Sequence, residues 1–111
     1  MEYRQLGGSG VEVSTVGFGA WVVGTDWWGD RDAGEAEAMV TAAVDAGAPL
    51  SDAGRVYGHG DSHRVLGPQL AHDRHAAVLA TQVGSDICSP TQSRHGHSHK
   101  DLSATPVRTE A

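Results

Sequence analysis

The chain has 111 residues, enough for one domain, and 39% apolar and 20% charged side chains, as in a globular segment rather than a fibre or a disordered tail. Eight basic against fourteen acidic residues leave a net charge of −6, which argues against a nucleic-acid partner. No run approaches the roughly 18 apolar residues that a membrane helix needs, so we expect no membrane-spanning segment. The chain begins without a secretory signal pattern, and its single cysteine, Cys88, fits the reducing cytoplasm.

The first part of the sequence predicts a β-hairpin followed by a buried strand. Residues 2–6 and 11–15 are short strand-like runs, and the glycine-rich segment 7–10 between them supplies the positive φ angles of a tight reversal. Residues 16–23 are then apolar except for glycines. Such a run is typical of a strand buried on both faces of a parallel sheet.

A helix is expected to begin near Asp32, because Glu35 three residues later completes the pattern of a capping box. Gly47 is the expected stop signal at the other end of this helix. Apolar residues with helical spacing follow Asp32 on one face, which predicts that this face is buried. They are Ala36, Met39, Val40, Ala43 and Val44.

Two more strands are predicted, over residues 48–53 and 76–83, with a helix between them. Ser62 is the predicted N-cap of this helix, which runs to about residue 71 and contains Pro68. The order of elements, a hairpin followed by β-α-β-α-β, indicates an α/β fold with a parallel sheet and crossover helices. Residues 85–111 are rich in Ser, His, Asp and Gly and predict an irregular or disordered tail.

Residues 1–84 resemble the N-terminal part of the aldo-keto reductases. The resemblance rests on Tyr-Arg-Gln-Leu-Gly in the hairpin, on Gly-Phe-Gly-Ala-Trp at residues 17–21, and on Asp52 with Tyr57-Gly and Ser62-x-x-x-Leu-Gly. It implies a (β/α)8 TIM barrel whose base is closed by the hairpin and which binds NADP(H) at the C-terminal ends of its strands. Such a barrel needs roughly 250 residues, so we expect a partial barrel in which five strands are missing.

The resemblance implies that Tyr57 gives a proton to the substrate carbonyl, supported by Asp52 and by a lysine at the end of the third strand. The lysine position holds Gln82. A free phenol has a pKa of about 10 and is a poor acid at neutral pH unless a cation eases its proton loss. Because an amide carries no charge, we expect a loss of at least several hundredfold in rate. Asp52 would also lose its partner.

The same resemblance places Gly19, Ala20, Trp21 and Asp52 near the nicotinamide ribose of the cofactor. It implies an NADP-dependent oxidoreductase that acts on a small carbonyl or alcohol substrate, present here as a truncated and catalytically impaired copy in the cytoplasm. The alternative is a non-catalytic nucleotide-binding or interaction module. An open sheet edge would also favour self-association.

Several residues keep two readings open. Asp52 and Tyr57 also fit an ordinary turn and a surface tyrosine, although the flanking matches favour the catalytic reading. The pair Trp27–Trp28 either forms a substrate-binding lip or covers the end of the sheet. Cys88 is expected to be unreactive because it has no identifiable basic partner. The alternating histidines at 95, 97 and 99 could ligate a metal, but we expect a solvated loop and predict no metal site.

Overall fold

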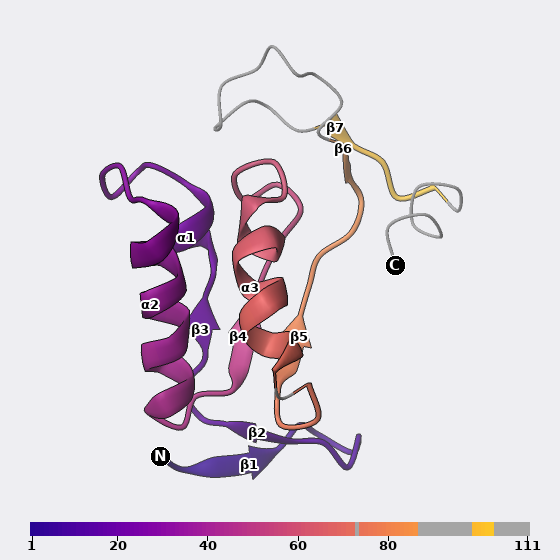
Figure 1. Cartoon of the computed structure of the whole chain (residues 1–111). Helices are drawn as coiled ribbons and strands as arrows, with labels where there is room; N and C mark the ends of the chain where they lie inside the picture. The colour runs from indigo at the N-terminus through magenta and orange to yellow at the C-terminus, as the bar shows by residue number, and fades with distance from the viewer. Residues whose placement is uncertain (73, 87–98, 104–111) are drawn as a thin grey trace.

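A computed structural model describes residues 1–72, 74–86 and 99–103. The three central strands form one parallel sheet in the order β3-β4-β5. The hairpin lies across the end of the sheet where these strands begin, and α2 and α3 lie along it (Figure 1). The predicted hairpin and the β-α-β arrangement are therefore confirmed. The elements are β1 (Tyr3–Gln5), β2 (Glu12–Ser14), β3 (Phe18–Gly19), α1 (Trp21–Gly24), α2 (Ala33–Asp45), β4 (Leu50–Asp52), α3 (Asp61–Ala71), β5 (Val78–Ala80), β6 (Ser85–Asp86) and β7 (His99–Lys100).

The strand predicted over residues 16–23 is confirmed only at its centre. β3 contains only Phe18 and Gly19, and the one-turn helix α1 begins at Trp21. The Ala20 N–H still donates to the Asp52 carbonyl at 2.8 Å, but the Ala20 carbonyl accepts the Gly24 N–H at 3.1 Å and closes the helical turn. An apolar run indicates burial without distinguishing strand from helix, which is why the sequence pattern misled.

Helix α2 begins as the capping box predicts. The Glu35 N–H donates to Asp32 Oδ1 at 2.8 Å, and the Asp32 N–H donates to Glu35 Oε2 at 3.3 Å. Gly47, with φ of +80°, follows the end of the helix in the left-handed conformation. On the predicted apolar face Val40 is fully buried, whereas Val44 is 42% exposed, so the last turn extends past the core.

Replacing Asp32 by alanine is expected to lower the free energy of unfolding by about 1 kcal/mol, because the first turn of α2 loses its side-chain acceptor. Urea denaturation followed by circular dichroism measures this change. The matched control is Asp45→Ala at the other end of the same helix, where the carboxylate lies at the negative end of the helix dipole and its loss should be neutral or slightly stabilising. Equal losses for the two variants would contradict the capping role.

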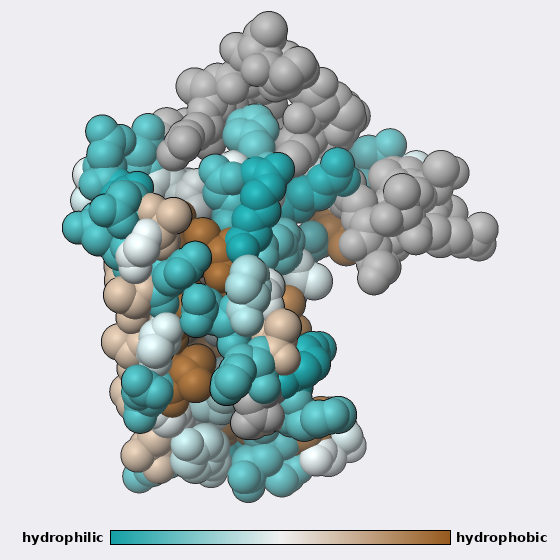
Figure 2. Space-filling model, viewed as in Figure 1, coloured by the Kyte–Doolittle hydropathy of each residue, from teal (hydrophilic) through white to brown (hydrophobic). Residues whose placement is uncertain are grey.

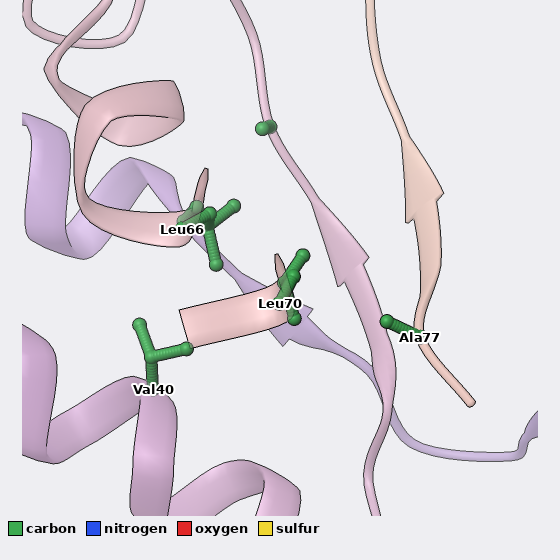
Figure 3. Packing of buried hydrophobic residues seen from close by; sticks show 6 residues of the cluster. Val40, Leu66, Leu70 and Ala77 are labelled. Carbon is green, nitrogen blue, oxygen red and sulfur yellow. The ribbon is translucent and has the colours of Figure 1, made fainter. Parts of the chain in front are cut away.

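The core lies between the sheet and the two long helices, and it is built largely from small residues. Leu66 and Leu70 of α3 point into the space between Val40 of α2 and Ala77 beside β5 (Figure 3). On the face shown in Figure 2, hydrophobic side chains show mainly in the seam between the helices, and hydrophilic ones cover most of α3. This packing fixes α3, and with it the segment between β4 and α3. The buried cluster comprises Ala20, Val40, Ala53, Leu66, Leu70 and Ala77.

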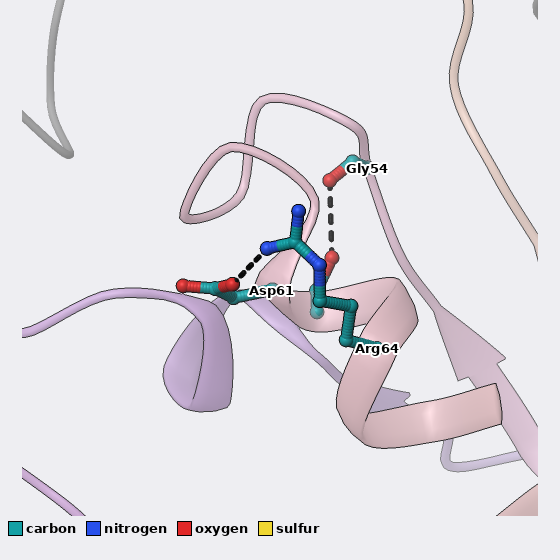
Figure 4. Close-up of polar contacts among 4 residues, drawn as sticks. Gly54, Asp61 and Arg64 are labelled. Atoms are coloured by element: carbon teal, nitrogen blue, oxygen red, sulfur yellow. Dashed lines mark hydrogen bonds and ion pairs between the residues drawn. The ribbon is translucent and has the colours of Figure 1, made fainter. Parts of the chain in front are cut away.

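The sequence predicted Ser62 as the N-cap of α3, and this prediction is wrong. Gly60, with φ of +94°, is the N-cap residue, and Ser62 lies in the first turn of the helix. The Ser62 hydroxyl is fully buried and donates to the carbonyl of Gly54 at 3.0 Å, next to an ion pair between Asp61 and Arg64 (Figure 4). A buried carbonyl eight residues earlier, in the segment that leads into α3, therefore takes the hydroxyl that a cap would use.

The tail over residues 85–111 is not irregular throughout its described part. β6 and β7 form an antiparallel pair, with Ser85 opposite Lys100, and the Lys100 ammonium donates to the Ser85 hydroxyl at 2.6 Å. This pairing joins segments distant in sequence, which a local pattern does not reveal. Cys88, His95 and His97 lie outside the described residues. In the part of the chain that the structure describes, no helix has the length and apolar character needed to cross a membrane.

Candidate active site

The residues singled out from the sequence gather at the edge of the sheet where its parallel strands end. Gly19 at the end of β3 lies opposite Asp52 at the end of β4, and Asp52 lies opposite Ala80 at the end of β5. The segment after β4 carries Tyr57, and the segment after β5 carries Gln82. The parallel arrangement therefore brings separate parts of the chain to one edge.

Tyr57 and Gln82 are in direct contact. The Gln82 side-chain amide donates to the Tyr57 hydroxyl oxygen, with Nε2 and the oxygen 2.7 Å apart. Gly54 makes room for this pair, because a Cβ there would lie 3.1 Å from the Tyr57 ring and 3.3 Å from Gln82 Oε1. Tyr57 is half-buried and Gln82 is exposed, so the hydrogen bond lies at the open side of the site.

Asp52 is near this pair in the sheet register but is not bonded to it. Its carboxylate is exposed, and among the described residues it forms no hydrogen bond or ion pair. Its main-chain carbonyl accepts the Ala20 N–H. Of the three predicted catalytic residues, the structure thus brings Tyr57 and Gln82 together and leaves Asp52 open to solvent.

The main chain of Tyr57 is held between α1 and the start of α3. The Tyr57 N–H donates to the Gly54 carbonyl at 2.9 Å, and the Tyr57 carbonyl accepts the Ser62 N–H at 3.3 Å. Gly24 at the end of α1 packs closely, since a Cβ there would lie only 2.7 Å from the Tyr57 carbonyl oxygen. Gly58 has φ of +62° and lies against the Gly24 carbonyl. These constraints fix the main chain that carries the phenol ring.

Trp21 joins Tyr57 to an aromatic cluster at the mouth of the site, made of Trp21, Trp27, Trp28 and Tyr57. The ring centroid of Trp21 lies 5.3 Å from that of Trp27, 5.0 Å from that of Trp28 and 6.3 Å from that of Tyr57. The Trp21 and Trp28 rings meet edge to face at 90°. The loop after α1 therefore places two more indoles beside the predicted cofactor residue.

Two sets of hydrogen bonds near the site were not predicted from the sequence. The guanidinium of Arg31 donates to the main-chain carbonyls of Val22, Trp28 and Gly29, which ties the loop after α1 into one shape. His63 Nε2 and Thr81 Oγ1 are hydrogen-bonded at 3.0 Å, next to Gln82 in the chain. Neither contact follows a motif, because both depend on where the chain returns in space.

The predicted cofactor residues fit a ribose in part. Gly19 is exposed, and a Cβ there would meet nothing within 4 Å, so a flat ligand could approach its backbone. The exposed carboxylate of Asp52 beside it is an acceptor of the kind that sugar hydroxyls bind. Trp21 is half-exposed at the same edge, whereas the Ala20 methyl is fully buried in the core and its N–H is already bonded. The Ala20 carbonyl accepts the Gly24 N–H as well, so Ala20 adds only its position.

Comparisons with known proteins identify the family of the chain. The model of the "Aldo/keto reductase family" matches residues 15–110. An aldo-keto reductase of Bacillus subtilis is 31% identical over 99 residues, which are 87% of this chain and 30% of that protein. An uncharacterized oxidoreductase of Mycobacterium tuberculosis is 41% identical over 86 residues, 75% of this chain and 26% of that protein.

Solved structures show the same fold. The holo form of an aldo-keto reductase from Bacillus halodurans superposes with a TM-score of 0.84 at 25% identity, covering 99% of this chain and 34% of that one. The chain thus spans about a third of the length of the relatives it matches, and its α/β architecture is consistent with part of their barrel. The chain belongs to the aldo/keto reductase family.

Proposed function

We propose that this chain supplies part of the active site of an NADP(H)-dependent carbonyl reductase, with Tyr57 as the proton donor and with turnover lowered by Gln82. One observation carries the proposal: in a member of this family, the amide of Gln82 lies 2.7 Å from the phenol oxygen, at the edge of the sheet where the parallel strands end. That edge is where an α/β fold places its ligand sites.

Each residue has a separate task in this proposal. Tyr57 donates its hydroxyl proton to the carbonyl oxygen of the substrate. Gln82 donates an N–H to the phenol oxygen and so stabilises the phenolate left after proton transfer, but only through a neutral donor. Such a bond is about half as strong as one from a cation, so the rate stays low. Gly19, Trp21 and Asp52 would hold the nicotinamide ribose, and the bound cofactor supplies the hydride.

The test is alcohol formation from a small aldehyde in the presence of NADPH, detected by mass spectrometry together with the loss of NADPH absorbance. We expect a turnover number below about 1 per second, the low end of ordinary enzymes, and no alcohol from the Tyr57→Phe variant. Faster turnover would contradict the impairment, and alcohol formation without the Tyr57 hydroxyl would contradict its role. NADPH binding with no alcohol at all would favour a non-catalytic nucleotide-binding module.

Location and assembly are further parts of this proposal. The single cysteine supports a cytoplasmic location. Self-association is supported by the sheet, because β3 and β5 each pair on one side only among the described strands. Leu79 on β5 is also partly exposed, which leaves an apolar side chain at that edge.

A further inference from the structure

We propose that His63, in the first turn of α3, is a positioning residue for the candidate site. Through its hydrogen bond to Thr81 it holds the neighbouring Gln82 where the amide of that residue meets the Tyr57 hydroxyl. The importance of this contact for catalysis rests on the proposed function. The contact itself requires neither cofactor nor turnover, so its dependence on His63 can be measured separately.

The pair formed by Tyr57 and Gln82 lies beyond the strands of the sheet. β4 ends at Asp52, β5 ends at Ala80, and the Ala53 N–H donates to the Ala80 carbonyl at 2.9 Å just past the end of β4. Gln82 follows two residues after the end of β5 and is exposed. The sheet therefore fixes where the two segments begin, and a contact outside the sheet is needed to fix how their side chains meet.

The first turn of α3 contacts both of these segments. On one side, the buried Ser62 hydroxyl donates to the Gly54 carbonyl at 3.0 Å, and the Ser62 N–H donates to the Tyr57 carbonyl at 3.3 Å. On the other side, His63 Nε2 and Thr81 Oγ1 are hydrogen-bonded at 3.0 Å. Ser62 and His63 are consecutive residues of one helix, with Cα atoms about 3.8 Å apart, so their main chains move together. The helix therefore sets the spacing between the two segments.

Apolar packing gives little support at this position. A hollow of about 260 Å³ lies beside α3 and β5, and its lining includes His63, Leu66 and Leu79. Leu79 is 37% exposed. At the other end of this hollow, the Arg74 guanidinium donates to the Ala77 carbonyl at 2.9 Å. Hydrogen bonds at the ends of the hollow therefore help to hold β5 and the residues after it against α3.

The contact that His63 supports depends on this restraint. It is a single hydrogen bond of 2.7 Å between two neutral groups, Gln82 Nε2 and the Tyr57 oxygen, at the open side of the site. Water competes for both partners of such a bond, so its net contribution is small unless the partners are held together. Without His63, we expect the ratio of paired to unpaired molecules to fall about three- to tenfold, as for the loss of one hydrogen bond.

The side-chain amide of Gln82 reports this ratio by NMR in the full chain labelled with ¹⁵N at glutamine. Its signal is the one that Gln82→Met removes, and Tyr57→Phe gives the position of the signal without the phenol oxygen. We expect His63→Leu to move the wild-type signal toward that position, by an amount that corresponds to the three- to tenfold fall. Thr81→Val, which removes the other partner of the hydrogen bond, should have the same effect.

Two further variants separate positioning from a general structural role. His63→Gln carries a side-chain nitrogen about as far from the main chain as imidazole Nε2, so it should restore the wild-type signal. His72→Leu, at the exposed C-terminal end of α3, is the matched control and should leave the signal unchanged. Circular dichroism shows whether each variant is folded. A Gln82 signal that His63→Leu does not move, or a shift that Thr81→Val does not reproduce, would overturn the inference.

Alcohol formation from a small aldehyde and NADPH distinguishes this inference from the proposed function. His63→Leu and Thr81→Val should each lower kcat about three- to tenfold and change KM little. If alcohol formation depends on Tyr57 but His63→Leu changes neither the Gln82 signal nor kcat, this inference fails and the proposed function stands. If both variants move the signal in a protein that forms no alcohol, the positioning role stands and the proposed function fails.

Discussion

Replacing Gly58 by alanine is expected to lower the free energy of unfolding by more than about 3 kcal/mol, a loss that few single substitutions reach. Two costs add at this position. The φ angle of +62° lies in the left-handed region, which costs a residue with a Cβ about 1–2 kcal/mol. The added Cβ would also collide with the Gly24 carbonyl oxygen, and neither backbone has a flexible end that could move aside.

Three other glycines separate these two costs. Gly60 has φ of +94° but open space around a Cβ, so Gly60→Ala should cost only the backbone term of about 1–2 kcal/mol. Gly24 has no positive φ, but its Cβ would lie 2.7 Å from the Tyr57 carbonyl oxygen, so Gly24→Ala reports the steric cost. Gly67, inside α3 with open space, has neither problem, and Gly67→Ala should stabilise the protein by about 0.5–1 kcal/mol.

Urea denaturation of the four variants measures the series. The close approach of α1 and the Tyr57 turn is supported if Gly58→Ala has the lowest free energy of unfolding of the four variants. Gly60→Ala and Gly24→Ala should have intermediate values, and Gly67→Ala should equal or exceed the wild type. If Gly58→Ala proves as stable as Gly60→Ala, or more stable, the contact with Gly24 does not hold the turn. That contact fixes the main chain on which Tyr57 is carried.

The fold was predictable where a local signal sets an element. The hairpin follows from its glycine-rich reversal, and the start of α2 follows from the Asp32–Glu35 capping box, which the structure confirms. The lengths of the strands were not predictable, because apolar character does not locate the end of a strand: the strands predicted over residues 16–23 and 76–83 shrink to Phe18–Gly19 and Val78–Ala80. Ala20 contributes to the core from beyond the end of β3, and Ala77 does so from before the start of β5.

The site was predictable to the extent that topology determines it. Tyr57 and Gln82 follow neighbouring parallel strands, so they had to reach the same edge of the sheet, and the structure brings them into contact. The exposed position of Asp52 could not be predicted from the sequence, nor could the hydrogen bonds from Arg31 to the main chain of the loop after α1. Both depend on side-chain directions that spacing does not encode.

Gln82→Lys is expected to raise the turnover number at least about a hundredfold in a protein whose barrel is complete. A suitable protein is a chimera in which residues 1–84 replace the matching part of the Bacillus subtilis aldo-keto reductase. Two unit charges 4 Å apart attract by about 4 kcal/mol at an effective dielectric constant of 20, and each 1.36 kcal/mol is tenfold in rate. The wild-type amide already lies 2.7 Å from the phenol oxygen, so the introduced ammonium would lie next to the oxygen on which the phenolate charge develops.

The exposed carboxylate of Asp52, at the end of the neighbouring strand, offers that ammonium a counter-charge, and among the described residues it has no bond that would have to break. Because the charge acts on proton transfer and not on substrate binding, kcat should rise while KM changes little. Gln82→Met, which keeps the length of the side chain without charge or hydrogen bond, is the matched control and should show no gain. Adding Tyr57→Phe to Gln82→Lys should abolish the gain, and a gain that persists in this double variant would show that the cation acts on some group other than the phenol.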